Sequence, residues 1–175
     1  MFLSTFKKEV QVLNEKIVKM YNEAPFIDGA FNEEEYYSSK PYRIMWLMKE
    51  AYGDPFSYPE FYMDHYEKFY KDLLFGRPKG TWGPVVYVSY SILNNFKPFD
   101  QIEPIKNDPE IIKILSKVAW VNLNKRESLT GSSSTKANIQ KASDEYSEIL
   151  EEQITLLKPN IVICVFKNIQ YCITF

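Results

Sequence analysis

Apolar residues recur every three or four positions near the start of the chain, with lysine and glutamate between them. This spacing places Phe6, Val10, Leu13 and Ile17 on one side of a helix. We expect an amphipathic helix over residues 3–22 that ends before Pro25. Residues 25–41 contain Pro25, Gly29, Pro41 and a run of polar and acidic positions, so a surface connection is predicted there.

Three short apolar runs without glycine or proline predict buried strands at residues 43–48, 118–123 and 161–166. The segments between the runs have helical character. Strands that alternate with helices favour a parallel sheet covered on both faces, joined by right-handed crossovers. We expect the first of these strands to lie in the middle. The expected fold class is therefore α/β, with a short parallel central sheet.

The intervening segments predict four helices with different signals. Residues 58–75 are dense in Tyr and Phe, and residues 84–94 begin with a proline suited to a first helical turn. Asp108-Pro109-Glu110 is typical of an N-cap, an N1 proline and a first-turn acid that open a short helix. The helix expected over residues 139–157 turns four apolar residues inward: Ile149, Ile154, Leu156 and Leu157.

Length and charge narrow the class of protein. The 175 residues suit one domain, spanning residues 1–175, and the net charge of −2 argues against bulk electrostatic attachment to nucleic acid, although a local basic rim is compatible with it. No run approaches the roughly 20 apolar residues of a membrane span, and the charged N-terminus is unlike a signal peptide. We expect a soluble, cytoplasmic protein.

The two cysteines, Cys164 and Cys172, lie within an apolar region near the end of the sequence. They form no recognisable zinc or iron–sulfur ligand set, so no metal or cofactor is expected. Reduced, buried thiols are the interpretation that fits a cytosolic chain.

Polar residues gather just after the first two predicted strands. Lys49 to Pro55 follows the first strand and carries Glu50 and Asp54 beside a glycine turn, while Asn122 and the basic pair Lys125-Arg126 end the second. A glycine-rich loop between the strands carries Arg77, Lys79 and Trp82. Because the carboxyl ends of parallel strands meet at one edge of a sheet, Glu50, Asp54, Trp82 and Asn122 are expected to line one cleft there. Taken alone, the two carboxylates fit a solvated turn better, and Asn122 fits a strand-end residue that bonds its own loop.

In this order the motifs resemble those of the uracil-DNA glycosylase superfamily, in the branch whose first motif reads Gly-Glu-Ala-Pro-Gly. Lys49 to Gly53 is similar to that motif at Glu50, Ala51 and Gly53, and departs from it at Lys49 and Tyr52. Thr81 to Pro84 corresponds to the family's Pro-Phe-Val-Gly-like segment, and Asn122 with its basic followers corresponds to the strand that ends in Asn. Leu157-Lys158-Pro159 and the apolar run after it complete a resemblance over about residues 42–167.

The resemblance implies a three-layer α/β/α domain that recognises a base in DNA and hydrolyses the base–sugar bond. Glu50 or Asp54 would position the hydrolytic water. The base would be held by four residues, with Trp82 stacking on its ring: Tyr52, Gly53, Trp82 and Asn122. The phosphates of the DNA backbone would bind to four basic residues: Arg77, Lys79, Lys125 and Arg126. The implied partner is single-stranded or damaged DNA, or a free nucleobase-like ligand.

The sequence also departs from the family. The family's last motif is a His-containing loop, whereas His65 is the only histidine and lies between the first two strands. Nine residues after Phe166 are too few for a crossover helix and a fourth parallel strand. Residues 171–175 are therefore expected to form a terminal extension or to pair antiparallel, which leaves an open sheet edge that favours a homodimer.

These departures make weak or absent catalysis the expected outcome, with base recognition retained. The alternative is a non-catalytic binding or interaction protein that keeps the fold. A small-molecule α/β hydrolase or a nucleotide-binding enzyme has less support, because the chain carries neither a phosphate-binding glycine signature nor a nucleophile motif.

Overall fold

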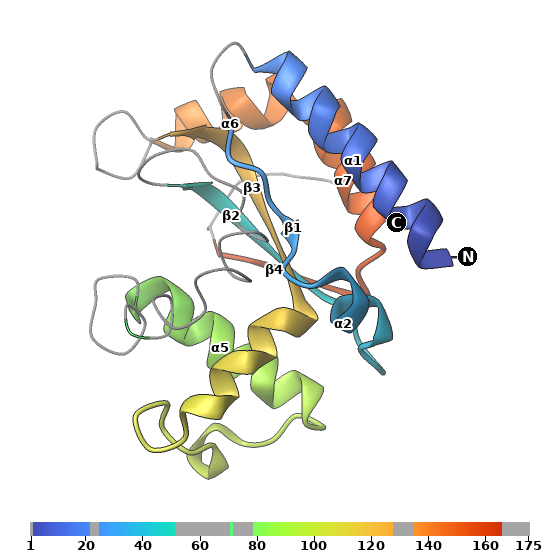
Figure 1. Ribbon diagram of the computed structural model, residues 1–175. Helices are drawn as coiled ribbons and strands as arrows, with labels where there is room; N and C mark the ends of the chain where they lie inside the picture. The colour runs from blue at the N-terminus through green and yellow to red at the C-terminus, as the bar shows by residue number, and fades with distance from the viewer. Residues whose placement is uncertain (1, 22–24, 52–70, 72–78, 128–134, 166–175) are drawn as a thin grey trace.

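The computed structural model describes residues 2–21, 25–51, 71, 79–127 and 135–165 (Figure 1). The strands are β1 (Gly29–Ala30), β2 (Ile44–Ala51), β3 (Val118–Glu127) and β4 (Ile161–Cys164). The α-helices are α1 (Phe2–Met20), α2 (Glu33–Ser38), α5 (Lys79–Leu93), α6 (Lys136–Glu145) and α7 (Ser147–Leu157), and two 3₁₀ helices are η1 (Phe99–Gln101) and η2 (Pro109–Lys117).

The four strands form one mixed sheet in the order β1-β3-β2-β4. β2 pairs parallel with β3 and with β4, so the predicted parallel trio, with its first strand in the middle, is confirmed. The short β1 adds an antiparallel partner to β3, pairing Gly29 with Trp120 and Ala30 with Ala119. The fold is therefore α/β with a sheet that is parallel except at the β1 edge.

Helices cover both faces of this sheet, which explains why the central strands are apolar without alternation. In β2, Ile44, Trp46 and Met48 pack on the face covered by α5 and η2, whereas Met45 and Leu47 pack toward α1, α6 and α7 (Figure 1). β3 divides in the same way, with Trp120 on the α5 side. Each face therefore has its own hydrophobic cluster, named here the α5-side and the α1-side clusters.

Both central strands extend further than predicted. β2 continues through Glu50 to Ala51, and β3 continues through Lys125 and Arg126 to Glu127. Glu50 pairs with Asn124, and a bulge follows between Glu50 and Ala51. Parallel pairing therefore overrides the polar composition that predicted loops, and Asn122 lies inside a strand and not at its end.

Residues 25–41 are not the surface connection that the sequence predicted. They contain β1 and α2, and Phe26, Asp28, Phe31 and Tyr36 are buried. α2 begins after Asn32, whose side-chain oxygen accepts a hydrogen bond from the backbone N–H of Glu35 (3.1 Å). Residues 25–41 are thus rich in turn-forming residues, yet they contain β1, the strand at one edge of the sheet.

Several predicted helices are present, but most of their boundaries differ from the prediction. α1 confirms the amphipathic N-terminal helix, and Asp108 caps η2 by accepting from the N–H of Glu110 (3.3 Å). α5 begins at Lys79, five residues before the predicted start, so Trp82 and Pro84 lie inside the helix and not at a loop. The helix expected over residues 139–157 is divided at Tyr146 into α6 and α7.

β4 is a half-buried strand at one end of the sheet, not the fully buried strand expected over residues 161–166. Cys164 is exposed, which corrects the expectation of a buried thiol. The homodimer through a sheet edge stays a prediction. The predicted helix at residues 58–75, with His65, and the tail that includes Cys172 lie outside the described residues.

Candidate functional site

Asn122 is the predicted site residue that the structure surrounds most completely. Its side chain is fully buried on the α5 side of β3, where its Oδ1 accepts a hydrogen bond from the indole N–H of Trp120 (3.2 Å). Its Nδ2 has no hydrogen-bond partner within the described part of the chain. A buried amide that keeps an unused donor is uncommon in folded proteins and marks the position as a candidate binding site.

The backbone of Asn122 is held by side chains at the point where the β1 ladder stops. Asp28 Oδ2 accepts from the N–H of Asn122 (2.7 Å), and the Lys125 ammonium donates to its carbonyl (3.1 Å). Both backbone groups of Asn122 are thus paired, although β1 pairs with β3 only as far as Gly29. The position of Asn122 is consequently fixed from the backbone side as well as from Trp120.

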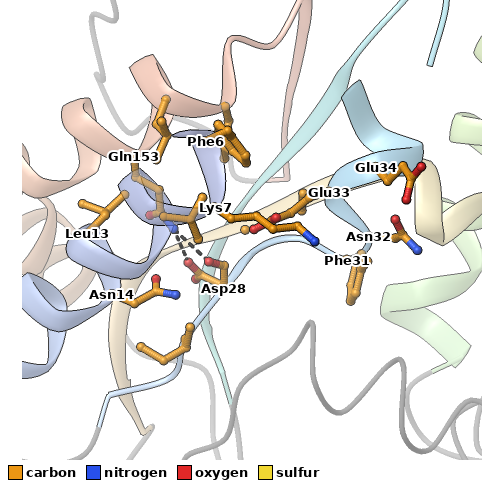
Figure 2. A pocket seen from close by; sticks show the side chains of 16 residues that line it. Phe6, Lys7, Leu13, Asn14, Asp28, Phe31, Asn32, Glu33, Glu34 and Gln153 are labelled. Carbon is orange, nitrogen blue, oxygen red and sulfur yellow. Dashed lines mark hydrogen bonds between the residues drawn. The ribbon is translucent and has the colours of Figure 1, made fainter. Parts of the chain in front are cut away.

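Asp28 and Lys125 form a buried ion pair on the α1 side of the sheet, with both side chains fully shielded from solvent (Nζ–Oδ1 2.8 Å). Gln153 of α7 donates from Nε2 to Asp28 Oδ1 (2.8 Å) and to the Asp28 carbonyl (3.0 Å), as Figure 2 shows. An ammonium in this setting is committed to Asp28 and Asn122 and cannot meet a phosphate at the surface. The structure therefore corrects the predicted phosphate contact of Lys125.

Glu50 and Trp82 lie on the same side of the sheet as Asn122. Met48 is the register partner of Asn122, and Glu50 is the next residue of β2 to point to that side. Trp82 is buried in the α5-side cluster, where its ring stacks on Trp120 at a centroid distance of 4.1 Å and an interplanar angle of 23°. Glu50, Asn122 and Trp82, which come from separate motifs, thus lie on one side of the sheet. Trp82 belongs to α5, where it stacks on Trp120, and not to the loop that the sequence predicted.

The other predicted site residues do not lie beside Asn122 in the described part of the chain. The Arg126 guanidinium donates to the hydroxyl of Tyr146 (2.5 Å) and lies 5.5 Å from the ring centroids of Tyr21 and Tyr146. These contacts tie Arg126 to the α1 side of the molecule. Lys79 is the first residue of α5. Four predicted residues lie outside the described part of the chain: Tyr52, Gly53, Asp54 and Arg77.

A cavity of about 490 Å³ lies between α1, α7 and the segment that contains β1, away from the predicted cleft (Figure 2). Phe6, Val10 and Leu156 are among its apolar lining residues, and Asp28 and Gln153 are among its polar ones. Its volume is in the range of small-molecule sites. The sequence signal for Asp28 is a single acid among apolar neighbours, Phe26-Ile27 before it and Ala30-Phe31 after it, which indicates a buried carboxylate.

Glu33 borders the same cavity, and burial raises the pKa of its carboxyl above the ordinary 4.5, while the nearby Lys7 opposes the shift. Since the folded state then holds the proton more tightly than the unfolded state, ionised Glu33 disfavours folding at neutral pH. Glu33→Gln should therefore raise the melting temperature at neutral pH relative to Glu34→Gln, its exposed neighbour in the same first turn of α2.

The difference between the two variants should disappear as the pH falls through the raised pKa of Glu33 and below 4.5, where the wild-type carboxyl is protonated in both states. Circular dichroism melts at neutral and acidic pH measure this. Equal melting temperatures of Glu33→Gln and Glu34→Gln at neutral pH would show that burial of Glu33 has no effect on stability.

No protein-family model matches the chain, and no curated protein or solved structure matches it either. Among the described residues, no group of three or more His, Cys, Asp or Glu side chains is arranged to hold a metal ion. None of the helices in that same part of the chain is long and apolar enough to cross a membrane.

Proposed function

We propose that the chain recognises a nucleobase through the side-chain amide of Asn122, in a fold of the uracil-DNA glycosylase type. The observation that carries this proposal is the unused Nδ2 donor of a fully buried asparagine whose backbone and Oδ1 are already held. The parallel trio β3-β2-β4 supports the same fold type. The partner is single-stranded or damaged DNA, or a free nucleobase-like ligand.

An amide suits a base edge because it offers a donor beside an acceptor. Nδ2 of Asn122 would donate to a base carbonyl, and the second lone pair of Oδ1 would accept from the adjacent ring N–H. The stacked pair of Trp82 and Trp120 supplies an aromatic wall on the same side of the sheet. Such a surface would hold a flipped base by its ring as well as by its edge.

Glu50 is the residue we propose to orient water if the base–sugar bond is hydrolysed. It is buried on the face that carries Asn122, at the carboxyl end of β2. His65, the one histidine of these 175 residues, does not match the family's histidine motif, and the loss of one such preorganised donor typically lowers a rate by about 10²–10³-fold. We therefore expect binding with weak or undetectable hydrolysis.

Burial shapes the expected kinetics of binding. Asn122 and Glu50 are both shielded from solvent, so a base reaches them only after neighbouring side chains move. Association should therefore be slower than the rates of about 10⁵–10⁷ M⁻¹s⁻¹ that are typical of preformed sites.

The test compares binding of single-stranded oligonucleotides that carry one central uracil or one central cytosine. The wild-type protein should prefer uracil by roughly 5- to 150-fold, because a good two-bond contact to a base edge discriminates by about 1–3 kcal/mol. Asn122→Ala should abolish the preference while leaving the salt-dependent background. Asn138→Ala, which changes an exposed asparagine on α6, is the matched control and should bind as the wild type does.

Equal binding of both oligonucleotides by the wild-type protein, with no cleavage of either, would contradict base recognition. The chain would then be better described as a non-catalytic binding or interaction protein. The cavity beside β1 would then be the better candidate for a binding site.

A further inference from the structure

Trp120 is in a position to control how the Asn122 amide is presented. An asparagine amide has two orientations, related by a rotation that exchanges its oxygen and its nitrogen. The indole N–H of Trp120 donates to Oδ1 at 3.2 Å, and an exchanged amide would set two donors against each other. One orientation is thus held while the other is excluded.

The other contacts of Asn122 remove the remaining freedom. Asp28 accepts from the N–H of Asn122 and Lys125 donates to its carbonyl. The backbone of Asn122 therefore cannot move to accommodate a rotated side-chain amide. Trp120 is itself held in place, because its ring stacks on Trp82 at a centroid distance of 4.1 Å. The direction of the free Nδ2 donor is therefore set by the fold before any ligand arrives.

Amide orientation decides which base edge fits. Uracil presents a carbonyl beside a ring N–H, whereas cytosine presents an amino group beside an unprotonated ring nitrogen, so the donor and the acceptor exchange places. With the sugar held on one side, a fixed amide pairs with only one of these two orders. An amide free to rotate would accept both.

We propose that Trp120 is a specificity-determining positioning residue: its indole N–H fixes the Asn122 amide so that the site selects bases with a carbonyl beside a ring N–H over bases with an amino group beside a ring nitrogen. The inference rests on the proposed function and adds to it the group that orients the Asn122 amide. It also assigns a role to a residue that the sequence motifs did not single out.

The test is Trp120→Phe, which keeps an aromatic ring against Trp82 and removes the N–H. The uracil-over-cytosine binding ratio expected of the wild-type protein should fall to within about twofold of unity, with the affinity for cytosine rising. Trp46→Phe is the matched control. Trp46 is a buried neighbour in the same cluster whose indole donates to Ser89 (3.0 Å), and its loss should leave the ratio unchanged.

A second readout separates this inference from the proposed function. The Asn122 side-chain amide of uniformly ¹⁵N-labelled protein should give one pair of proton resonances in the wild type and in Trp46→Phe. In Trp120→Phe these resonances should double or broaden as the amide exchanges between orientations. If the wild type shows no base preference, the proposed function fails, and these resonances alone decide whether Trp120 fixes the amide. An unchanged amide spectrum in folded Trp120→Phe, or an unchanged binding ratio where the wild type has one, would overturn the inference.

Discussion

Replacing Lys125 with methionine should lower the free energy of unfolding by about 3–5 kcal/mol, a large share of the total for a domain of this size. Methionine retains much of the lysine stem but removes the ammonium, so the buried Asp28 carboxylate loses its counter-charge. The carbonyl of Asn122 also loses a donor. Urea denaturation followed by circular dichroism measures the change.

Two further variants identify the cause of this effect. Asp28→Asn combined with Lys125→Met removes both charges and should recover part of the lost stability, because a neutral pair leaves no uncompensated charge in the interior. Lys16→Met breaks the exposed pair with Glu152 on α1 and α7, and should cost no more than about 1 kcal/mol. A Lys125→Met protein as stable as Lys16→Met would show that Asp28 is not buried as the structure describes.

Shortening Leu47 to alanine should lower the free energy of unfolding by about 2–5 kcal/mol. Leu47 is fully buried in the central strand, where it pairs with Val121 on one side and Cys164 on the other. Its side chain packs in the α1-side cluster, so alanine leaves a cavity beneath α1, α6 and α7. The denaturant midpoint should fall with an unchanged slope.

Val12→Ala is the matched control for Leu47→Ala, because Val12 lies on the solvent side of α1 with half of its surface exposed. It should change stability by less than about 0.5 kcal/mol. A similar loss in both variants would contradict the placement of β2 at the centre of the sheet.

The central sheet was predictable because its strands are covered on both faces, so every position in a strand such as β2 has the same requirement for apolar side chains. β1 was not predictable, because its two residues are too few to show a period. The polar ends of the strands were missed for a different reason. Lys125 looks like a loop cation in the sequence, and only Asp28, nearly a hundred positions away, makes its burial acceptable.

The predicted site residues are placed in part as the sequence suggested. Asn122 stands out through its motif, and Glu50 and Trp82 lie on the same side of the sheet. Trp120 lies two residues before Asn122, so the alternation of side chains along a strand already places both on one face. Asp28 carries no such local signal, because its hydrogen bond to the N–H of Asn122 depends on how the segment that contains β1 packs beside β3.

The most direct test of base recognition is a titration of ¹⁵N-labelled protein with free uracil, followed through the side-chain amide resonances of Asn122. These resonances are identified by their absence from Asn122→Ala. Base recognition predicts that both Nδ2 protons shift progressively with uracil, that cytosine shifts them far less, and that Gln153 beside the cavity is unaffected. Shifts at Gln153 with none at Asn122, or no shift at either residue, would contradict the assignment of Asn122 as the group that reads the base.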